Sequence, residues 1–410
     1  MCDMIETQVC IVGGGPAGMV AGLLFARAGV RTLVLEKHAD FLRDFRGDTV
    51  HPSTLDLFDE LGLLDALLAR PHDKVTDVEA VLGGKPYRIA DFTHLPGRGT
   101  FIAMMPQWEF LDFVAREARR YPAFALRMEC EGVALVEEAG RVAGVRTADG
   151  ETIAARLVIA ADGRGSKLRA AAGLPLRDLG APIDVLWFRV PKPRSEANQT
   201  QGYIASGEMI VAIDRGDYFQ CARVIEKGSA AAILARGVAA FRAEVEAVVP
   251  PVAGLMGQLA GLDEVRLLGV SLDRLTRWSR PGLLAIGDAA HAMSPVGGVG
   301  INLAVQDAVA AANLLAGPMA RGEAVDPLLP KVQARRAFPV KVIQAMQRTI
   351  HHTVLRAALA GTVTKSPWPV RLIGAVPLLQ RIPARVLGLG VRREHIRSPD
   401  AGEARLGANK

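Results

Sequence analysis

The most restrictive feature of this chain is the glycine-rich stretch GGGPAG at residues 13–18, which directly follows an apolar run. The apolar run is typical of a short buried strand, and residues 16–28 are typical of a helix that begins inside the glycines. Gly13, Gly15 and Gly18 occupy the G-x-G-x-x-G positions. The first glycine allows a tight turn, the second lets a pyrophosphate approach the backbone, and the third lets the helix pack on the strand. The stretch therefore predicts a dinucleotide-binding turn.

An acidic residue ends the second predicted strand, at residues 31–35. Glu36 lies near the offset of about 20 residues at which such a carboxylate hydrogen-bonds a ribose hydroxyl. Its charge would repel a 2′-phosphate, so FAD or NAD is favoured over NADP as the bound dinucleotide. A glycine-rich turn that binds no ligand is the alternative. The ordered succession of strand, helix and Glu36 disfavours that alternative.

The composition indicates a globular protein, because 410 residues are enough for two or three domains with their own cores. Half of the residues are hydrophobic, and no repeat or low-complexity tract is evident. No signal-peptide pattern precedes the first strand and no uncharged apolar segment reaches about 18 residues, so we expect a cytoplasmic protein that does not span a membrane. The cysteines show no C-x-x-C spacing, which predicts reduced, buried thiols and disfavours a disulfide reductase.

Two further stretches indicate which dinucleotide is bound. Residues 157–169 form an apolar strand that ends at Asp162, and residues 280–316 lead from a strand through Asp288 and a Pro/Gly loop into a long helix from about Gly300. An aspartate at a strand end can accept a hydrogen bond from a ribityl hydroxyl. A helix N-terminus can hold the negative charge of a reduced isoalloxazine. These are the requirements of a flavin rather than of a nicotinamide.

Together the three stretches resemble the fingerprints of single-component, FAD-dependent class A monooxygenases, the para-hydroxybenzoate hydroxylase-like family. Residues 46–65 and 105–118 resemble further segments of that family, so the likeness covers most of residues 8–316. The resemblance implies an α/β fold with a Rossmann-like FAD-binding domain, an inserted β-sheet substrate domain and a helical C-terminal segment. The expected ranges are 1–75, 100–180 and 270–320 for the discontinuous FAD-binding domain, 76–99 and 181–269 for the substrate domain, and 321–410 for the C-terminal segment.

The resemblance also implies roles for individual residues around a noncovalently bound FAD. Glu36 is expected at the adenosine ribose, Asp288 at the ribityl chain, and Arg46 at a phosphate near the entry to the flavin. Arg46 and Pro295, on the flavin side, are the catalytic candidates. Val299 departs from the glutamine that relatives often have, which changes little because backbone amides bind the flavin there. The expected cofactor contacts are Gly13, Gly15, Pro16, Ala17, Gly18, Glu36, Lys37, Arg46, Gln107, Val133, Asp162, Gly163, Asp288, Pro295, Gly298, Val299, Gly300, Ile301 and Asn302.

His291, which closely follows Asp288, has two interpretations: a catalytic role or a role in fixing the loop. No acidic partner for it is visible in the sequence, and it belongs to the fingerprint itself, so the loop-fixing role is favoured. No Ser/His/Asp set and no metal-ligand cluster is evident in the sequence, and the resemblance requires neither.

Between the fingerprints, three short β-branched or aromatic runs in residues 182–225 predict a β-sheet, and residues 76–101 give a weaker strand signal. In the resembling family such a sheet covers the flavin and forms the substrate pocket. Side-chain alternation predicts a shared face for Val185, Trp187, Arg189, Met209, Val211 and Ile213. The expected pocket residues are Trp187, Met209, Val211 and Phe219, with a purely structural core as the alternative for Trp187 and Phe219. No phenol-binding tyrosine can be located, which favours a bulkier or more apolar substrate.

The resemblance implies a reaction in which NAD(P)H reduces FAD and leaves. O₂ then forms a flavin C4a-hydroperoxide, which passes oxygen to an electron-rich carbon of an aromatic or otherwise apolar small molecule. One dinucleotide-binding unit is visible, so NAD(P)H is expected as a transient co-substrate. The alternatives are a FAD-dependent dehydrogenase or reductase of a lipid-like or quinone substrate, and a flavin-binding sensor with little turnover. A flavin-dependent halogenase is disfavoured because the W-x-W-x-I-P segment is missing.

The C-terminal segment is strongly basic. Residues 321–410 contain 16 Lys and Arg but 5 Asp and Glu, whereas the whole chain has a net charge of +6. Residues 335–360 predict an amphipathic helix, and the prolines and glycines of residues 368–393 favour short helices. A lid that packs on the FAD domain is the favoured role, and weak peripheral membrane contact is the alternative. No nucleic-acid partner is expected, and the oligomeric state is left open. The predicted apolar stripe comprises Val340, Ile343, Met346, Ile350, Val354 and Leu359.

Overall fold

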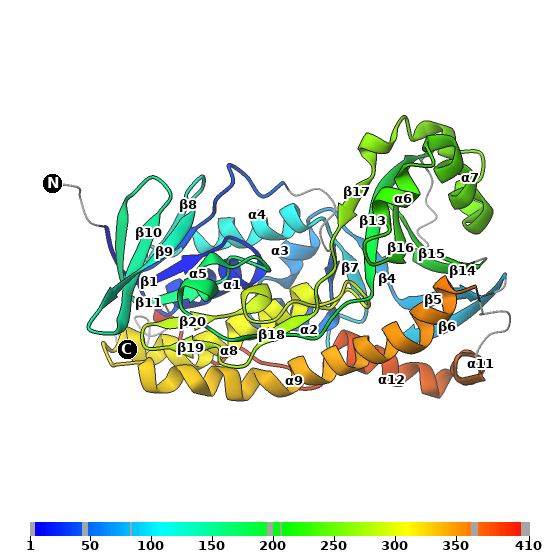
Figure 1. Cartoon of the computed structure of the whole chain (residues 1–410). Helices are drawn as coiled ribbons and strands as arrows, with labels where there is room; N and C mark the ends of the chain where they lie inside the picture. The colour runs from blue at the N-terminus through cyan, green and yellow to red at the C-terminus, as the bar shows by residue number, and fades with distance from the viewer. Residues whose placement is uncertain are drawn as a thin grey trace.

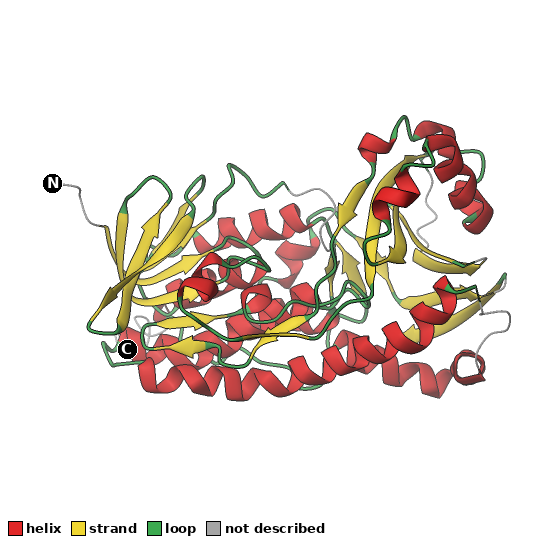
Figure 2. Ribbon diagram, in the orientation of Figure 1, coloured by secondary structure: helices red, strands yellow, loops and turns green. Residues whose placement is uncertain are grey.

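The computed structural model describes residues 5–42, 48–82, 84–194, 200–205, 207–361 and 368–402. Figures 1 and 2 show two sheet-containing parts beside each other, with a long helix running along one side of both. Within the described residues, one part contains an eight-stranded sheet and the other a seven-stranded sheet.

The first sheet has the strand order β19-β20-β11-β1-β2-β8, with β10 and β9 branching from β11. Its central strand β1 (Ile5–Val12) pairs in parallel with β11 (Thr152–Ala160) and β2 (Thr32–Leu35). Parallel strands covered on both faces are continuous apolar runs, and the second half of β1 is fully apolar and buried. Because the carboxyl ends of parallel strands meet at one edge, the residues after β1, β2, β11 and β20 are brought together there. The other strands are β8 (Phe124–Arg127), β9 (Gly132–Glu138), β10 (Arg141–Thr147), β19 (Ser279–Arg280) and β20 (Leu283–Ala285).

Helices cover this sheet, and α1 (Pro16–Arg27) packs between β1 and α8 (Gly300–Ala320). The helix α8 is long and apolar enough to cross a membrane by length and composition. It is 72% buried inside the protein, however, so it is the central helix of the core. The remaining helices of this part are α2 (Pro52–Glu60), α3 (Leu64–Leu68), α4 (Gln107–Ala118) and α5 (Lys167–Ala171).

The second sheet draws its strands from two separate stretches of sequence, within residues 76–99 and 181–269. Its neighbours are antiparallel except for β14 and β5. One face packs against α7 (Val238–Val248) through a compact apolar cluster. The other face turns toward the first part of the molecule. The strand order is β17 (Arg266–Leu268), β13 (Ile183–Pro191), β16 (Tyr218–Glu226), β15 (Glu208–Asp214), β14 (Thr200–Ala205), β5 (Asp77–Leu82) and β6 (Lys85–Asp91).

Small strand pairs and short helices complete the two parts. The strands β3 and β4 both pair with β7, and β12 pairs with β18. These strands lie in the connections between the two larger sheets, whereas the short helix α6 lies between β16 and α7 of the second part. Their bounds are β3 (Thr49–Val50), β4 (Asp73–Val75), β7 (Ile102–Met104), β12 (Leu176–Asp178), β18 (Asp273–Leu275) and α6 (Ala230–Leu234).

The long helix of Figure 1 is α9 (Leu329–Ile350), which continues into a single π-helical turn (His351–Leu355) and α10 (Arg356–Leu359). The predicted start at residue 335 was wrong, because the helix begins six residues earlier. The chain then forms α11 (Trp368–Ala375) and α12 (Pro377–Gly388), which both pack on β6. After α12 the chain returns along the first part of the molecule, where Arg27 pairs with Asp400 at 3.1 Å.

The predicted apolar stripe of α9 was only partly right. Val340 and Ile343 are buried, but Val354 is exposed. The buried face also contains the polar residues Arg336, Gln344 and Gln347, each of which lies four residues from Val340 or Ile343. The sequence pattern missed them because a polar residue is normally placed on the solvent side.

The cysteines within the described residues are free and buried, as predicted, and Cys2 lies outside those residues. Burial raises the pKa of Cys10 and of Cys221 to about 12. Both thiols therefore stay protonated at neutral pH and serve as small apolar groups of the core.

Candidate functional site

The loop between β1 and α1 gives its three motif glycines different environments. A Cβ at Gly13 would lie 2.2 Å from the carbonyl oxygen of Ala161, and a Cβ at Gly18 would lie 1.9 Å from that of Gly13. These two positions must be glycine for the backbone to pack. A Cβ at Gly15 would meet no atom within 4 Å, so the space beside the start of α1 is open. Pro16 begins α1 and no side chain caps it, which leaves the first-turn N–H groups available to a diphosphate.

Glu36 lies beside this loop at the end of β2. Its Oε2 accepts a hydrogen bond from the Gly14 N–H at 2.9 Å, and its Oε1 accepts one from the His38 N–H at 3.1 Å and also contacts the His38 ring. The Cys130 N–H donates to the Glu36 carbonyl, which brings the start of β9 and the backbone of Val133 close to the same end of the sheet. The Glu36 carboxylate therefore lies directly against the glycine-rich loop, and its contact with a ribose hydroxyl stays a prediction. Lys37, the next residue, is exposed.

Two loops predicted separately meet at the carboxyl ends of β11 and β20. Asp162 accepts hydrogen bonds from the Ser166 hydroxyl at 2.5 Å and the Leu168 N–H at 3.3 Å. Burial raises the pKa of this carboxyl, and these donors counteract part of the increase. The adjacent Gly163 has a φ of +84°, which favours glycine.

Arginines join those loops. Asp288, in the turn after β20, forms an ion pair with Arg164 at 3.0 Å. Arg169 donates to the carbonyl oxygens of Asp288 and Ala289 at 3.4 and 3.3 Å. Neither arginine was predicted to have a role, because their partners lie more than a hundred residues away in the sequence.

The loop before α8 is a tight turn held from a distant part of the chain. The Gly298 N–H donates to the Pro295 carbonyl at 2.9 Å, and the Thr49 hydroxyl donates to the Gly298 carbonyl at 2.7 Å. The Asn302 side chain accepts from the His51 N–H at 2.9 Å and the Thr54 hydroxyl at 2.7 Å. The side chain of Asn302 thus holds α8 to the start of α2.

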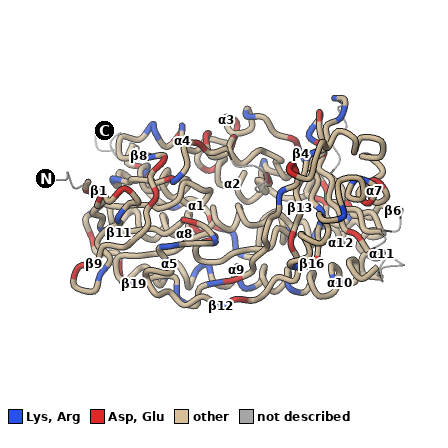
Figure 3. The backbone as a smooth tube through the Cα atoms, turned by 45° about the horizontal axis from the view of Figure 1, so that its top comes forward, with Lys and Arg blue, Asp and Glu red and all other residues tan. Residues whose placement is uncertain are grey.

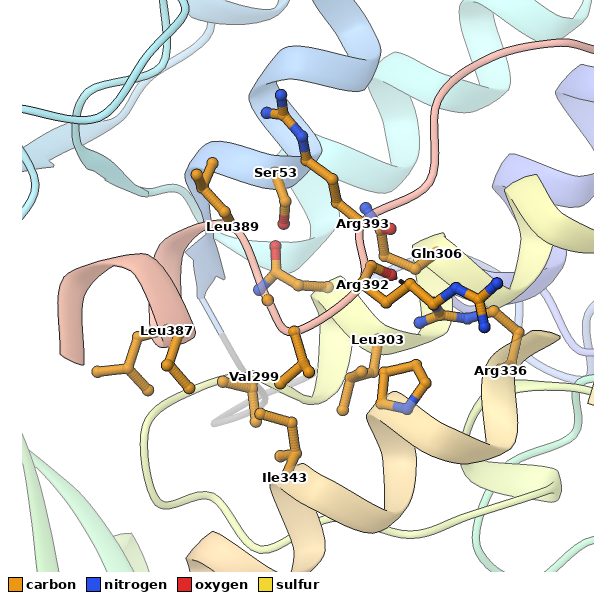
Figure 4. Close-up of a pocket in the computed structure, with 15 residues that line it drawn as sticks. Ser53, Val299, Leu303, Gln306, Arg336, Ile343, Leu387, Leu389, Arg392 and Arg393 are labelled. Carbon is orange, nitrogen blue, oxygen red and sulfur yellow. Dashed lines mark hydrogen bonds between the residues drawn. The ribbon is translucent and has the colours of Figure 1, made fainter. Parts of the chain in front are cut away.

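The N-terminus of α8 has an open side and a packed side. A Cβ at Gly300 would meet nothing within 4 Å, as at Gly15. Val299 lies on the packed side, where it lines a cavity of about 30 Å³ together with Leu303, Ile343 and Leu387. Beside this cavity the chain that follows α12 crosses over α8 (Figure 4). Ile301 is half-buried beside it. The structure therefore leaves space for a cofactor at two helix N-termini, where backbone N–H groups and the helix dipole favour negative charge.

The comparisons with known proteins agree with this geometry. The FAD binding domain family matches residues 6–346. The chain belongs to this family. The protein is thus a FAD-dependent monooxygenase of the para-hydroxybenzoate hydroxylase-like class, which confirms the predicted fold class and cofactor.

Among curated relatives, 6-methylpretetramide 4-monooxygenase of Streptomyces rimosus is 34% identical over 340 residues, which cover 82% of this chain and 81% of that protein. A ubiquinone hydroxylase of Rhodospirillum rubrum is 26% identical over 408 residues, with 90% and 93% covered. The solved structure of p-nitrophenol 4-monooxygenase from Pseudomonas putida has a TM-score of 0.73 at 20% identity and covers 94% of this chain and 96% of that one. This last likeness shows the shared fold.

A buried ion cluster supports the cofactor loops of the monooxygenase. Asp307, on α8, accepts from the His291 Nε2–H at 2.6 Å, the Gly287 N–H at 3.1 Å and the Arg336 Nε–H at 2.9 Å. All three side chains are about 1% exposed or less. Burial alone would raise the pKa of Asp307, but His291 and Arg336 outweigh it and leave this pKa below its usual value. The loop-fixing interpretation of His291 fits this arrangement. The acidic partner was missed because it lies 16 residues away, on the next helix.

The buried polar face of α9 binds the loop that precedes Pro295. Gln344 donates to the Ala292 carbonyl at 3.2 Å, and Gln347 donates to the carbonyls of Ser294 and Val296 at 2.9 Å each. His351, in the π-helical turn, contacts the Ser294 hydroxyl at 2.9 Å. π-Helical turns often occur at functional sites, and this one aims a ring at the residue directly before Pro295.

His51 connects the C-terminal segment of the monooxygenase to the same loop. Its Nδ1–H donates to the Leu387 carbonyl at the end of α12, at 2.8 Å. The ring is fully buried, and burial lowers its pKa to about 4. At neutral pH this histidine is therefore uncharged. The only sequence signal for His51 was its place in residues 46–65, which resemble a family segment.

The predicted face of the second sheet exists. The strands β13, β16 and β15 are neighbours, with β16 in the middle. Val185 and Met209 lie on either side of Val224 of β16, and Trp187 and Val211 lie on either side of Ala222, two residues along the strand. Trp187, Met209 and Val211 pack in one cluster with Val296 of the flavin-side loop. The indole Nε1–H of Trp187 is buried and has no hydrogen-bond partner among the described residues.

The prediction that Phe219 lines the substrate pocket was wrong. Phe219 lies opposite Val190 and Asp214. It is an odd number of residues from Ala222, which lies between Trp187 and Val211, so its side chain faces the other side of the sheet. There it packs in the cluster that α7 covers. Phe219 is therefore a core residue and is removed from the candidate pocket.

Gln107, another predicted cofactor contact, lies near the junction of the two parts. Gln107 begins α4, and its backbone N–H bonds to Asp48. Asp48 in turn pairs with Arg215 of the second part at 2.5 Å. Burial raises the pKa of Asp48, against the effect of Arg215. Arg46, one of the two predicted catalytic candidates, lies outside the described residues.

Proposed function

We propose that the protein is an NAD(P)H- and O₂-dependent monooxygenase that hydroxylates an aromatic or otherwise electron-rich apolar small molecule. The observation that carries the proposal is that Trp187, Met209 and Val211 of the sheet face border the same apolar cluster as Val296, the residue after Pro295. A substrate held there would contact mainly hydrocarbon, with the Trp187 N–H as a donor for one polar group. The names of the relatives, which include a hydroxylase of ubiquinone and a monooxygenase of pentachlorophenol, support an aromatic substrate.

The residues that would hold FAD divide between the two open helix N-termini. Gly15, Ala17 and the start of α1 would bind the diphosphate, with Glu36 at the ribose. Asp288 would exchange its ion pair with Arg164 for a ribityl hydroxyl, and the Gly298–Asn302 backbone would contact the isoalloxazine. When bound, FAD supplies the electron transfer from NAD(P)H and the activation of O₂.

The protein's own contribution is to position the reactants and to exclude water. The loop at Pro295 is immobilised by Gln347, Thr49 and His351, so the flavin side of the pocket is preorganised. The apolar sheet face removes water from the reacting region, which suppresses side reactions. No described residue is placed as a catalytic base.

Isotopically labelled O₂ tests the proposal. Purified protein with FAD should consume NAD(P)H faster in the presence of a polycyclic phenol or quinol, and the label should appear in the product. Consumption with no label in the product would favour the dehydrogenase alternative. No stimulation across phenols, quinols and aromatic polyketides would favour the sensor alternative.

Trp187→Phe tests the pocket, because it removes the indole N–H and keeps an aromatic ring. We expect a KM increase of about fivefold to tenfold, equivalent to one neutral hydrogen bond of about 1 kcal/mol, with FAD content unchanged. Trp108→Phe, on α4 and away from that sheet face, is the matched control and should leave KM unchanged. Equal KM values for both variants would remove Trp187 from the pocket.

We also propose that the C-terminal segment closes the site as a lid, the role that the sequence analysis favoured over peripheral membrane contact. A Cβ at Gly297 would lie 3.0 Å from Leu387 Cδ2, so the end of α12 packs directly on the flavin-side loop. Leu387→Ala should loosen this contact and divert NAD(P)H oxidation toward hydrogen peroxide. Unchanged coupling of NAD(P)H oxidation to product in this variant would contradict the lid role.

A further inference from the structure

Large exposed apolar side chains are concentrated in α11, α12 and the short connection between them. Trp368 is 74% exposed, Leu378 65% and Ile382 61%, and Leu372 and Val376 are also exposed. Elsewhere in the described residues exposed large apolar side chains are more scattered, for example Leu176 on β12 and Phe338 on α9. Single exposed apolar residues are ordinary, but five within 15 residues form a patch that calls for a partner. We call these five residues the C-terminal apolar patch.

The spacing shows that the patch is an outward-facing stripe on helices that are anchored from behind. Trp368 and Leu372 are four residues apart on α11, as are Leu378 and Ile382 on α12. On the inner side, a Cβ at Gly374 would lie 3.0 Å from the ring of Tyr87. Ala384 is fully buried against the second sheet. The helices therefore already have their packing partners, and the patch is not the uncovered core of a missing strand.

The charged side chains on the two helices of the patch are all positive. Residues 361–393 contain no Asp or Glu, and Arg371, Arg381 and Arg385 are exposed on the same two helices. A symmetric contact with a second copy of this chain would bring these arginines together with no acidic residue of these helices to neutralise them. An anionic surface with an apolar interior satisfies both the arginines and the apolar stripe. Exposed tryptophan is also favoured at the boundary between water and lipid.

We propose that α11 and α12 dock the monooxygenase on an anionic lipid surface. The two helices would lie in the plane of the interface, with the C-terminal apolar patch among the acyl chains and the three arginines at the headgroups. Figures 1 and 3 place both helices at the end of the molecule opposite to β1, so the large FAD-binding part extends away from the lipid.

The docking surface is continuous with the candidate active site. The helix α12 carries Leu378 and Ile382 on its exposed stripe and ends next to Leu387, whose carbonyl bonds to His51 and whose side chain packs at Gly297. An apolar substrate dissolved in lipid would thus be collected at the outer side of the helix that closes the site. This consequence rests on the proposed function, whereas docking itself does not.

Co-sedimentation of the full FAD-bound protein with vesicles tests the docking. We expect binding to phosphatidylglycerol-containing vesicles, weaker binding at high salt, and little binding to pure phosphatidylcholine. Arg381→Gln with Arg385→Gln should lower the partition coefficient about 30-fold, since each basic residue near an anionic surface contributes about fivefold. Leu378→Ser with Ile382→Ser should lower it about tenfold or more, because the apolar anchor is lost.

The matched control is Leu176→Ser with Phe338→Ser, which removes two exposed apolar side chains outside the patch and should leave vesicle binding unchanged. Flavin absorbance and circular dichroism of every variant report whether it has folded. Equal binding to neutral and anionic vesicles, or no binding to either, would overturn the proposal. So would self-association of the wild type that the Leu378/Ile382 variant abolishes, because the occupant would then be a second copy.

Vesicle binding is measured without turnover, so it separates the two proposals. A protein that binds anionic vesicles but incorporates no oxygen into any product retains the docking and loses the proposed function. A protein that hydroxylates its substrate and ignores vesicles shows the reverse.

Discussion

Removal of the Asp307 carboxylate should destabilise the monooxygenase strongly, although the residue lies outside the predicted site. Asp307 is fully buried and accepts hydrogen bonds from His291, Gly287 and Arg336. Asp307→Ala would leave a buried guanidinium without its closest carboxylate and a buried backbone N–H without an acceptor. Breaking a buried ion pair in this way typically costs about 3–5 kcal/mol.

The structure places the expected loss at the lower end of that range. Arg336 also donates to the Arg392 carbonyl at 3.1 Å and lies 3.5 Å from Glu394, so part of its charge remains compensated. We therefore expect a loss of about 3 kcal/mol for Asp307→Ala, a large share of a typical total stability of about 5–15 kcal/mol. Asp307→Asn keeps the shape and one acceptor and should lose less.

Urea unfolding at pH 7, followed by circular dichroism with FAD in excess, measures this difference. The pKa of Asp307 lies below its usual value in the folded state, so its contribution is fully present above that usual value and is lost only as the pH falls below it. Neutral pH therefore reports the whole effect. Glu323→Ala, which removes an exposed partner of Arg321, is the control and should not change stability measurably. Equal unfolding free energies for Asp307→Ala and the wild type would refute the reasoning.

Three other perturbations separate packing from cofactor binding. Gly18→Ala should destabilise the fold by about 2 kcal/mol or more, because the new Cβ would lie 1.9 Å from a carbonyl oxygen. Gly15→Ala should fold normally but lose FAD affinity, because a Cβ there would meet no protein atom within 4 Å. Thermal denaturation and the flavin content of the purified protein distinguish the two variants. His51 has a pKa of about 4 in the folded protein, below the unfolded value of about 6.5. The free energy of unfolding should therefore fall by roughly 3 kcal/mol as the pH drops from 6.5 to 4. Urea unfolding of His51→Gln should lack this pH dependence, and an unchanged pH slope in that variant would contradict the prediction. Asp288→Asn should weaken FAD binding about tenfold to a hundredfold in equilibrium titration, as expected for the loss of one charge-assisted hydrogen bond. Arg164→Gln, which removes the ion-pair partner of Asp288, should not weaken FAD binding. Retained FAD affinity in Asp288→Asn would exclude Asp288 from the site.

The nucleotide-binding turn of this protein could be predicted from residues that are close together in the sequence. The turn at Gly13–Gly18 needs its glycines because strand, turn and helix are neighbours in sequence, and Glu36 follows at the end of the next strand. The second sheet was predictable for the same reason, since alternation along β13 and β15 is a property of each strand alone. The error at Phe219 shows the limit of that argument, because a shift of one residue moves a side chain to the opposite face.

Tertiary structure alone decided what holds those local elements in place. Asp307 meets Arg336 across 29 residues, Gln347 reaches Ser294 across 53, and His51 meets Leu387 across 336. No periodicity signals such contacts, because a polar residue on a helix looks the same in sequence whether it faces water or a buried loop. The C-terminal helices show the converse: their apolar residues resemble a core in sequence, and only the packing on β6 reveals that Trp368, Leu378 and Ile382 remain on the outside. The physical reason is that burial depends on which elements arrive at a surface, and that depends on the whole chain.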